Sequence, residues 1–197
     1  MKATFNKRKD FVYEVDYNIE QDDSTVMEHL RAEEWEPITG DYGQDDLGQR
    51  YRCYAPHSVV LQQIMFYFRT EEFKNAIIDT LYADPAFPGW WGISPERMKA
   101  ATKSFGILTL DKPGFGTGIH LDNRALVASG MCYFIEGDDP LQATTFFADA
   151  ERKDPVRMTT GFGKGWVAAG MHDAWHDGHN ASDKDRYVVL LGLSLNI

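Results

Sequence analysis

The second half of this chain is a succession of short β-prone segments, most of them separated by residues that form turns. Glycine, proline, aspartate and asparagine punctuate the sequence at short intervals after residue 104. Many short strands with frequent turns predict a β-sandwich or jelly roll. The expected strands are Phe105–Leu110, Thr117–Leu121, Leu126–Ile135, Thr144–Ala148, Val156–Thr159, Gly165–Gly170, Ala174–Asp177 and Arg186–Leu195.

The first half has a different texture, in which helical spacing of apolar residues dominates. Asp23-Ser24 has the composition of a helix N-cap, and apolar residues recur at helical intervals after several such caps. The expected helices are Thr25–Glu34, Ser58–Phe68, Glu71–Tyr82 and Ser94–Lys103, and the expected strands are Phe11–Tyr17 and Tyr51–Tyr54. We therefore predict one mainly β domain over residues 1–197. Residues 1–103 form a helical and strand support region with about three helices, and residues 104–197 form the jelly-roll core.

Charge and composition exclude several classes of partner. The formal net charge is −10, which disfavours extended nucleic acid and anionic membrane surfaces. The N-terminal residues contain no apolar leader, and no apolar run approaches the roughly 18 residues of a membrane helix. Cys53 and Cys132 match no metal or redox spacing, so two buried, reduced thiols are expected. A cytoplasmic protein is the default, and the oligomeric state is left open.

Three motifs resemble known signatures but fail on their context. Two glycine-rich segments, Gly114–Gly118 and Gly161–Gly165, lead into β-prone sequence and lack the residues that a phosphate loop requires. His172–His176 has the i, i+4 histidines of a zinc protease. Aspartate replaces the glutamate base there, and flanking glycines disfavour a helix. Turns and a β segment are therefore the better interpretation.

His120-Leu-Asp122 is a stronger candidate for chemistry. On an extended segment, residues i and i+2 point to the same side, so this imidazole and this carboxylate converge without special backbone geometry. A C-terminal group of histidines supplies a further ligand, because two histidines and one carboxylate form the facial ligand set of non-haem iron(II). Arg186 follows His176 by ten residues, at the start of a closing apolar strand.

In this combination the chain resembles the Fe(II)/2-oxoglutarate-dependent dioxygenases, the double-stranded β-helix oxygenases that include prolyl hydroxylases. The resemblance covers residues 105–195, about half the chain. It rests on His120-x-Asp122, on Ser129–Tyr133 in the next strand, and on His176-Asp-Gly-x-Asn followed by Arg186. It implies a double-stranded β-helix, a cupin-like jelly roll that N-terminal helices buttress.

The resemblance also implies the cofactors and their ligands. His120, Asp122 and His176 would bind Fe(2+), and Arg186 would bind the far carboxylate of the cosubstrate 2-oxoglutarate. Tyr133 aligns with a tyrosine that hydrogen-bonds the same carboxylate in related hydroxylases, although a core tyrosine is an equal alternative. The implied reaction uses O2, hydroxylates a C–H bond of a small molecule or peptide side chain, and releases succinate and CO2.

Several alternatives stay open at this stage. His172 and His179 compete with His176 as the distal ligand, and the spacing to Arg186 favours His176. A non-catalytic cupin-type metal-binding jelly roll would keep the histidines without needing the arginine. A structural β-sandwich and a zinc hydrolase rank lower.

Some segments are candidates for the walls or lid of a site. Trp90 and Trp91 are expected to pack in the core rather than line a pocket. The candidate lids are the loops Asp41–Gly48, Ala83–Gly92 and Glu151–Asp154.

Overall fold

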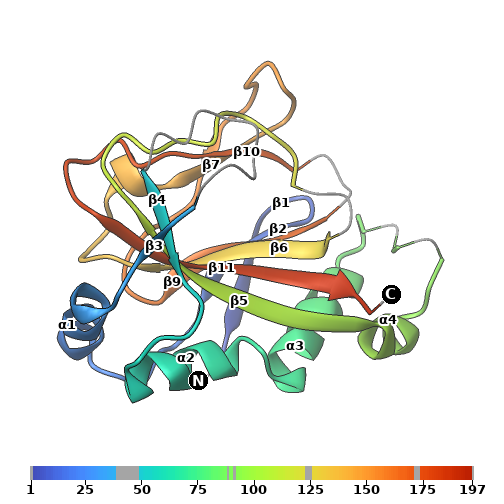
Figure 1. Cartoon of the computed structure of the whole chain (residues 1–197). Coiled ribbons are helices and arrows are strands. Elements are labelled where there is room, and N and C mark those ends of the chain that lie inside the picture. Colours follow the sequence, from blue (N-terminus) through green and yellow to red (C-terminus); the bar gives the residue numbers. More distant parts are fainter. Residues whose placement is uncertain are drawn as a thin grey trace.

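Two antiparallel sheets lie one above the other, and helices cover the outer face of the larger one (Figure 1). The computed structural model describes residues 2–38, 49–87, 89–90, 92–122, 126–170 and 174–196. The strands are β1 (Thr4–Lys9), β2 (Val12–Asp16), β3 (Glu36–Pro37), β4 (Arg50–Cys53), β5 (Thr102–Asp111), β6 (Leu126–Phe134), β7 (Thr144–Phe147), β8 (Val156–Arg157), β9 (Lys164–Ala169), β10 (Trp175–Gly178) and β11 (Arg186–Leu195). The helices are α1 (Asp23–Ala32), α2 (Val59–Tyr67), α3 (Glu71–Tyr82) and α4 (Pro95–Ala101).

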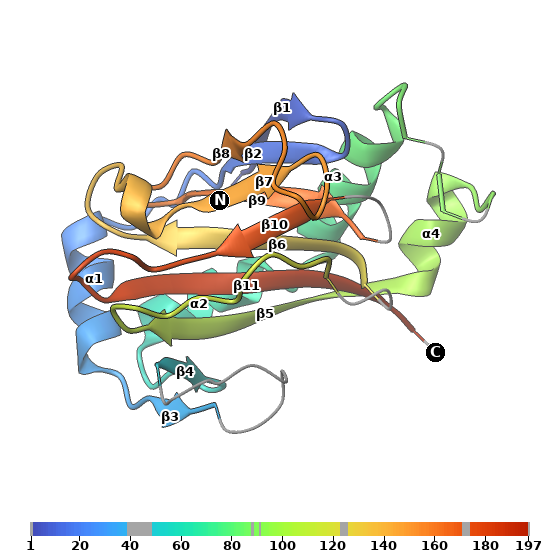
Figure 2. The ribbon, with the colours of Figure 1, turned by 90° about the horizontal axis from the view of Figure 1, so that it is seen from above.

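The larger sheet has eight strands in the order β1-β2-β9-β6-β11-β5-β4-β3, and the smaller has the order β10-β7-β8. The small sheet lies over the centre of the large one when the molecule is viewed from above (Figure 2). β11 is central, since it pairs with β5 on one side and β6 on the other. Strands from residues 1–103 and from residues 104–197 therefore belong to one hydrogen-bonded sheet, in agreement with the predicted mainly β fold.

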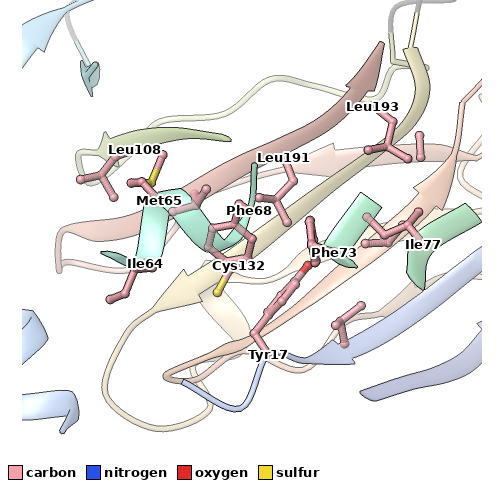
Figure 3. Packing of buried hydrophobic residues seen from close by; sticks show 14 of the residues in the cluster. Tyr17, Ile64, Met65, Phe68, Phe73, Ile77, Leu108, Cys132, Leu191 and Leu193 are labelled. Atoms are coloured by element: carbon pink, nitrogen blue, oxygen red, sulfur yellow. The ribbon is translucent and has the colours of Figure 1, made fainter. Parts of the chain in front are cut away.

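Side chains that alternate along β11 divide the core into two layers. Leu191 and Leu193 belong to the cluster between the large sheet and the helices, where Phe68 and Phe73 also lie (Figure 3). Val188 faces the other way, into a second cluster between the two sheets. A strand buried on both faces reads as a continuous apolar run, and residues 187–193 have this character.

Each helix begins at a side chain that accepts a backbone N–H, as the cap residues predicted. For α1 this side chain is Asp22, one residue before the expected Asp23-Ser24 pair. Helix α4 ends at Ala101, short of the predicted Lys103, because Thr102 already pairs with Leu195 in the sheet. None of the helices in the described residues is long and apolar enough to cross a membrane.

Strand β1 was not predicted, because its sequence Thr4–Lys9 is dominated by charged residues. It forms the edge of the large sheet, paired with β2. Charged side chains, lysine above all, are common on edge strands because they discourage pairing with another chain. Its lysines therefore belong to a sheet edge.

Candidate metal centre

His120 and His176 are joined by their own backbones. The N–H of His120 donates to the carbonyl of His176 at 2.9 Å, and the reverse bond is 3.0 Å long. Directly opposed residues in an antiparallel pair project to the same side of the sheet, and the two ring centroids are 4.4 Å apart. The structure thus brings together the two histidines that the sequence singled out.

The segment that carries His120 is more irregular than the predicted strand Thr117–Leu121. It pairs with the β10 side through isolated bridges, Gly116 with His179 and His120 with His176. Between these bridges the N–H of Gly178 donates to the hydroxyl of Thr117, 3.0 Å away, where a regular ladder would use a carbonyl. The segment still lies along the outer edge of the small sheet.

Asp122 completes a cluster of three candidate ligands. Its Oδ1 lies 3.7 Å from His120 Nε2, and its Oδ2 lies 3.6 Å from His176 Nε2. One ligand atom from each residue lies within 4.8 Å of the others. Ligands at right angles on one ion with bonds near 2.1 Å are roughly 3 Å apart, so each of the two distances from Asp122 to an imidazole would shorten by roughly 0.6–0.7 Å around an ion.

The hydrogen bonds of both imidazoles leave the correct nitrogen free for a metal. His120 Nδ1 lies 3.0 Å from the carbonyl of Gly118, and His176 Nδ1 lies 2.9 Å from that of Ala174. A carbonyl can only accept, so Nδ1 carries the proton and Nε2 keeps its lone pair. Metal-binding histidines are typically oriented in this way. The donor set therefore fits a divalent metal ion.

The pKa shifts of the three residues differ in direction. Burial lowers the pKa of His176, which favours its neutral, ligating form. Contact with Asp122 raises the pKa of His120. Burial acts to raise the pKa of Asp122, but its contacts with His120, His176 and Ser129 outweigh this and lower it. Asp122 is thus a carboxylate at neutral pH.

Aromatic side chains close one side of the cluster and leave the other open. The ring centroids of Phe146 and Trp166 lie 5.0 and 5.2 Å from that of His176, whose side chain is 5% exposed. The side chains of His120 and Asp122 are 33% and 26% exposed. A ligand can therefore approach from the side of His120 and Asp122.

Arg186 is fully buried, and most of its donors are in use. Nε and Nη2 donate to Asp111 Oδ2 at 3.1 and 2.7 Å. Nη1 donates to the carbonyls of Gln142 and His179, each 2.8 Å away. These bonds occupy four of the five N–H groups of a guanidinium. One N–H of Nη2 is left without a protein partner in the described part of the chain.

A second arginine shares Asp111, and no sequence pattern predicted it in the site. Arg50 donates from Nε to Oδ1 at 2.5 Å and from Nη2 to Oδ2 at 3.0 Å, and its guanidinium lies 3.9 Å from the ring centroid of Phe115. Burial acts to raise the pKa of Asp111, but the two guanidiniums outweigh it and lower the pKa. Arg50, Asp111 and Arg186 occupy directly opposed positions on β4, β5 and β11, and this arginine row carries one surplus positive charge.

Tyr133 is also buried and hydrogen-bonded within the protein. Its hydroxyl donates to Thr144 Oγ1 at 2.9 Å and accepts the N–H of Thr144 at 3.0 Å. The side chain faces the space between the sheets, and its exposure is 0%. This position is consistent with both roles predicted for Tyr133, the contact with the cosubstrate and the place in the core.

The competing residues have other places. The ring of His179 lies beside Gly116, and His179 is absent from the ligand cluster of the described residues. His172, Trp91 and the loop Asp41–Gly48 lie outside the residues that the structure describes. Trp90 packs 4.4 Å from the ring centroid of Phe87, which confirms the expected core role.

Two further predictions concern thiols and loops. Cys53 and Cys132 are buried and free, as predicted. Residues 151–154 form an exposed turn after β7, and neither this turn nor the described part of Ala83–Gly92 shows contacts that test a lid function.

The fold can be compared with known structures. Its two facing antiparallel sheets have the architecture of a double-stranded β-helix. Known structures support this fold. A prolyl-4-hydroxylase from Pseudomonas putida is 16% identical, with a TM-score of 0.56 over 89% of this chain and 86% of that one.

Two further structures have the same fold. A prolyl hydroxylase from Trichoplax adhaerens, solved with a hypoxia inducible factor peptide fragment, is 10% identical with a TM-score of 0.59, covering 94% of this chain and 84% of its own. The α-ketoglutarate-dependent epimerase SnoN of nogalamycin biosynthesis is 12% identical with a TM-score of 0.56, covering 94% and 76%. No family model and no curated protein matches this chain. The chain thus has the fold of Fe(II)/2-oxoglutarate oxygenases.

Proposed function

We propose that this protein is an Fe(II)- and 2-oxoglutarate-dependent dioxygenase. The observation that carries the proposal is the cluster of His120, Asp122 and His176, in which both Nε2 lone pairs and an ionised carboxylate face one point. These three residues would hold Fe(II) on one face and leave the opposite face for small ligands. With O2 and 2-oxoglutarate, iron bound in this way supplies an oxidant strong enough to attack an unactivated C–H bond.

The residues around the cluster would position and enclose the reacting groups. The carbonyls of Gly118 and Ala174 accept the Nδ1 protons of the imidazoles and so fix the orientation of the rings. Phe146 and Trp166 keep water from the buried side of His176. A site that excludes water in this way protects reactive groups from side reactions.

For the cosubstrate carboxylate we propose Arg186, with Tyr133 nearby. The surplus positive charge of the arginine row supports this assignment, because a buried charge is stabilised by an anion. An incoming carboxylate would accept the remaining N–H of Arg186 Nη2. A second hydrogen bond from Arg186 to this carboxylate would require Asp111 or one of the two carbonyls to give up its own. Tyr133 would have to rotate its hydroxyl from Thr144 to take part.

The most direct test is 2-oxoglutarate turnover. Purified protein, freed of metal and reloaded anaerobically with Fe(II), should convert 2-oxoglutarate to succinate when O2 is admitted. His176→Ala should lose this activity and should also bind no Fe(II), which separates loss of the site from loss of turnover. Wild-type protein that binds no Fe(II) would contradict the proposal.

The reaction outcome that we propose is hydroxylation of a C–H bond in a small molecule or a peptide side chain. Similar structures include two prolyl hydroxylases and an epimerase, so the fold serves both outcomes. Hydroxylation places one atom of O2 in the product, whereas epimerisation places none. Turnover under labelled O2, read by mass spectrometry of the product, distinguishes them.

A second candidate is a metal-binding module without catalysis. The observation that favours it is the burial of Arg186 and Tyr133, both 0% exposed and bonded within the protein. Such a module would bind a divalent ion at the same cluster but would not consume 2-oxoglutarate. Metal binding without succinate formation would support it.

A further inference from the structure

Strand β4, which lies beside the edge strand β3, places an arginine on the inner face of the large sheet. Arg52 lies opposite Thr109 on β5, Thr109 opposite Val188 on β11, and Val188 opposite Tyr133 on β6. Directly opposed residues share a face of a sheet. Val188 and Tyr133 belong to the cluster between the two sheets, so Arg52 projects toward the same interior.

The position of the metal centre along the sheet can be read from the adjoining rows. The next row contains Ile107, Leu190, Met131 and Trp166, and the Trp166 ring lies against His176. On the far side of the Arg52 row lies the arginine row, which ends in Arg186. Counted along the strands, Arg52 thus lies in the row between that of Trp166 and that of Arg186; across the sheet it is on β4, four strands from β9.

The open part of the interior is on the Arg52 side. In its own row Thr109, Val188 and Tyr133 are completely buried. Ile107 and Leu190, by contrast, are half-buried, as Arg52 itself is. A ligand that reaches the exposed sides of His120 and Asp122 therefore passes over Ile107 and Leu190, toward Arg52.

The guanidinium of Arg52 has a buried hydrogen-bond donor that is not in use. Its Nε is buried without a hydrogen-bond partner, and no ion pair of Arg52 is found among the described residues. Glu36 is its cross-strand neighbour on β3 but does not form an ion pair with it. The guanidinium lies 4.5 Å from the ring centroid of Tyr54, which orients it without using its in-plane donors.

We propose that Arg52 binds a carboxylate of a small organic acid held beside the metal. The inference rests on the proposed function and deepens it, because it names the chemical class of a ligand and a residue that binds it. The ligand is an anion, although the protein itself has a net charge of −10. An arginine matches a carboxylate with two parallel N–H donors, and a buried unpaired Nε gains most from such a partner. The acid is either the substrate or the cosubstrate, whose distal carboxylate Arg52 would then bind in place of Arg186.

The test compares three variants after loading with Mn(II), a redox-inert substitute for Fe(II). Arg52→Gln removes the charge, Arg52→Lys keeps it without the planar fork, and Arg97→Gln removes an exposed arginine on α4 as the matched control. Titration calorimetry measures the binding of 2-oxoglutarate and of 2-oxobutyrate, which lacks the distal carboxylate. Glutarate is then titrated into protein already saturated with 2-oxoglutarate. Melting temperatures verify that each variant is folded.

Two results support the proposal and identify the acid. If Arg52→Gln weakens 2-oxoglutarate binding by about tenfold and leaves 2-oxobutyrate unchanged, Arg52 holds the cosubstrate. If 2-oxoglutarate binding is unchanged but glutarate binding falls by about tenfold, Arg52 holds the substrate. Arg52→Lys should fall between the wild type and Arg52→Gln.

The proposal is overturned if Arg52→Gln binds 2-oxoglutarate and glutarate as tightly as the wild type and Arg97→Gln. It is overturned equally if 2-oxoglutarate binding is insensitive and the wild type binds no glutarate. A wild type that binds Mn(II) but no 2-oxoglutarate contradicts the proposed function instead. Glutarate titrated into the Mn(II)-loaded protein then tests Arg52 by itself.

Discussion

At the scale of single residues, two backbone carbonyls orient the imidazoles of the metal centre. Gly118 and Ala174 each accept the Nδ1 proton of a histidine, and so they fix which nitrogen of His120 and His176 faces Asp122. The same carbonyls limit rotation of the rings. The ligand set is therefore oriented by main-chain atoms that side-chain substitution does not remove.

The first prediction concerns the distal ligand. His176→Ala removes one of three ligands, so Mn(II) affinity should fall by more than about 100-fold, beyond the 10–100-fold loss typical of outer-sphere changes. Binding can be measured by calorimetry or by the electron paramagnetic resonance signal of free Mn(II). His179→Ala is the matched control, and its affinity should stay within about threefold of the wild type. The reverse ranking would reassign the ligand.

At the scale of elements, the arginine row ties three neighbouring strands together through one carboxylate. Asp111 and Arg186 have no exposed surface, and Arg50 is nearly buried. A charge left without its partner in such a place costs far more than a surface ion pair contributes. The row is therefore a structural element of the β4–β5–β11 region whether or not a ligand uses its surplus charge.

We predict that Asp111→Asn lowers the free energy of unfolding by about 3–5 kcal/mol, because it leaves two guanidiniums without an anion. Urea unfolding followed by circular dichroism measures this. The control is Glu136→Gln, which disrupts the exposed pair with Arg31 and should cost less than about 1 kcal/mol. Similar losses in both variants would show that the arginine row contributes no more than a surface pair.

The stability difference between the wild type and Asp111→Asn should also depend on pH. The pKa of Asp111 is lowered in the folded state, so the stability that its carboxylate contributes is fully present above its ordinary pKa of about 3.9. That contribution is lost as the pH falls through the lowered, folded-state pKa. The difference in unfolding free energy between the wild type and Asp111→Asn should thus be constant from about pH 5 to 7 and shrink below about pH 4. A difference that grows on acidification would contradict the assignment.

Strand β9 packs so closely against β6 that a side chain at Gly165 would collide with the main chain. A Cβ on Gly165 would lie 1.8 Å from the carbonyl oxygen of Met131, whereas the nearest atom to a Cβ on Gly178 would be 3.5 Å away. Gly165→Ala should therefore destabilise the protein by about 3 kcal/mol or more, and Gly178→Ala by less than about 1 kcal/mol. Thermal and urea unfolding measure both, and equal effects would show that the strands separate easily.

At the scale of the whole molecule, metal binding and folding are linked. An ion that binds the folded chain alone stabilises it by about 2.7 kcal/mol at a concentration of 100 times Kd. For a chain of this size that raises Tm by roughly 5–10 °C. Scanning fluorimetry with Mn(II) and with a chelator should show this shift in the wild type and lose it in His176→Ala. An equal shift in the variant would place the ion elsewhere.

Local signals in the sequence predicted most of the fold. Alternation predicted the strand in Phe11–Tyr17, and helical spacing of apolar residues predicted Glu71–Tyr82 with its correct bounds. The charged strand β1 has no apolar alternation, so its pairing with β2 had no local signal. The end of α4 was misplaced because pairing with β11 overrides helix propensity at Thr102.

The site was predictable where it depends on short spacing. His120 and Asp122 lie two residues apart, and the ten-residue spacing from His176 to Arg186 resembles the spacing in a known family. The partnership of Arg50 with Asp111 spans 61 positions and depends on the register of β4 against β5, which no local pattern specifies. The same holds for Arg52, whose role follows from the row that it occupies.

The main-chain bridge between His120 and His176 has a consequence for metal exchange. Because peptide hydrogen bonds set the spacing of the imidazoles, the separation of these ligands does not depend on the ion. A cation can depart and another can take its place while the polypeptide keeps its shape. Selection among cations then depends on their supply and on their coordination preferences, because the backbone places the two imidazoles side by side before an ion binds.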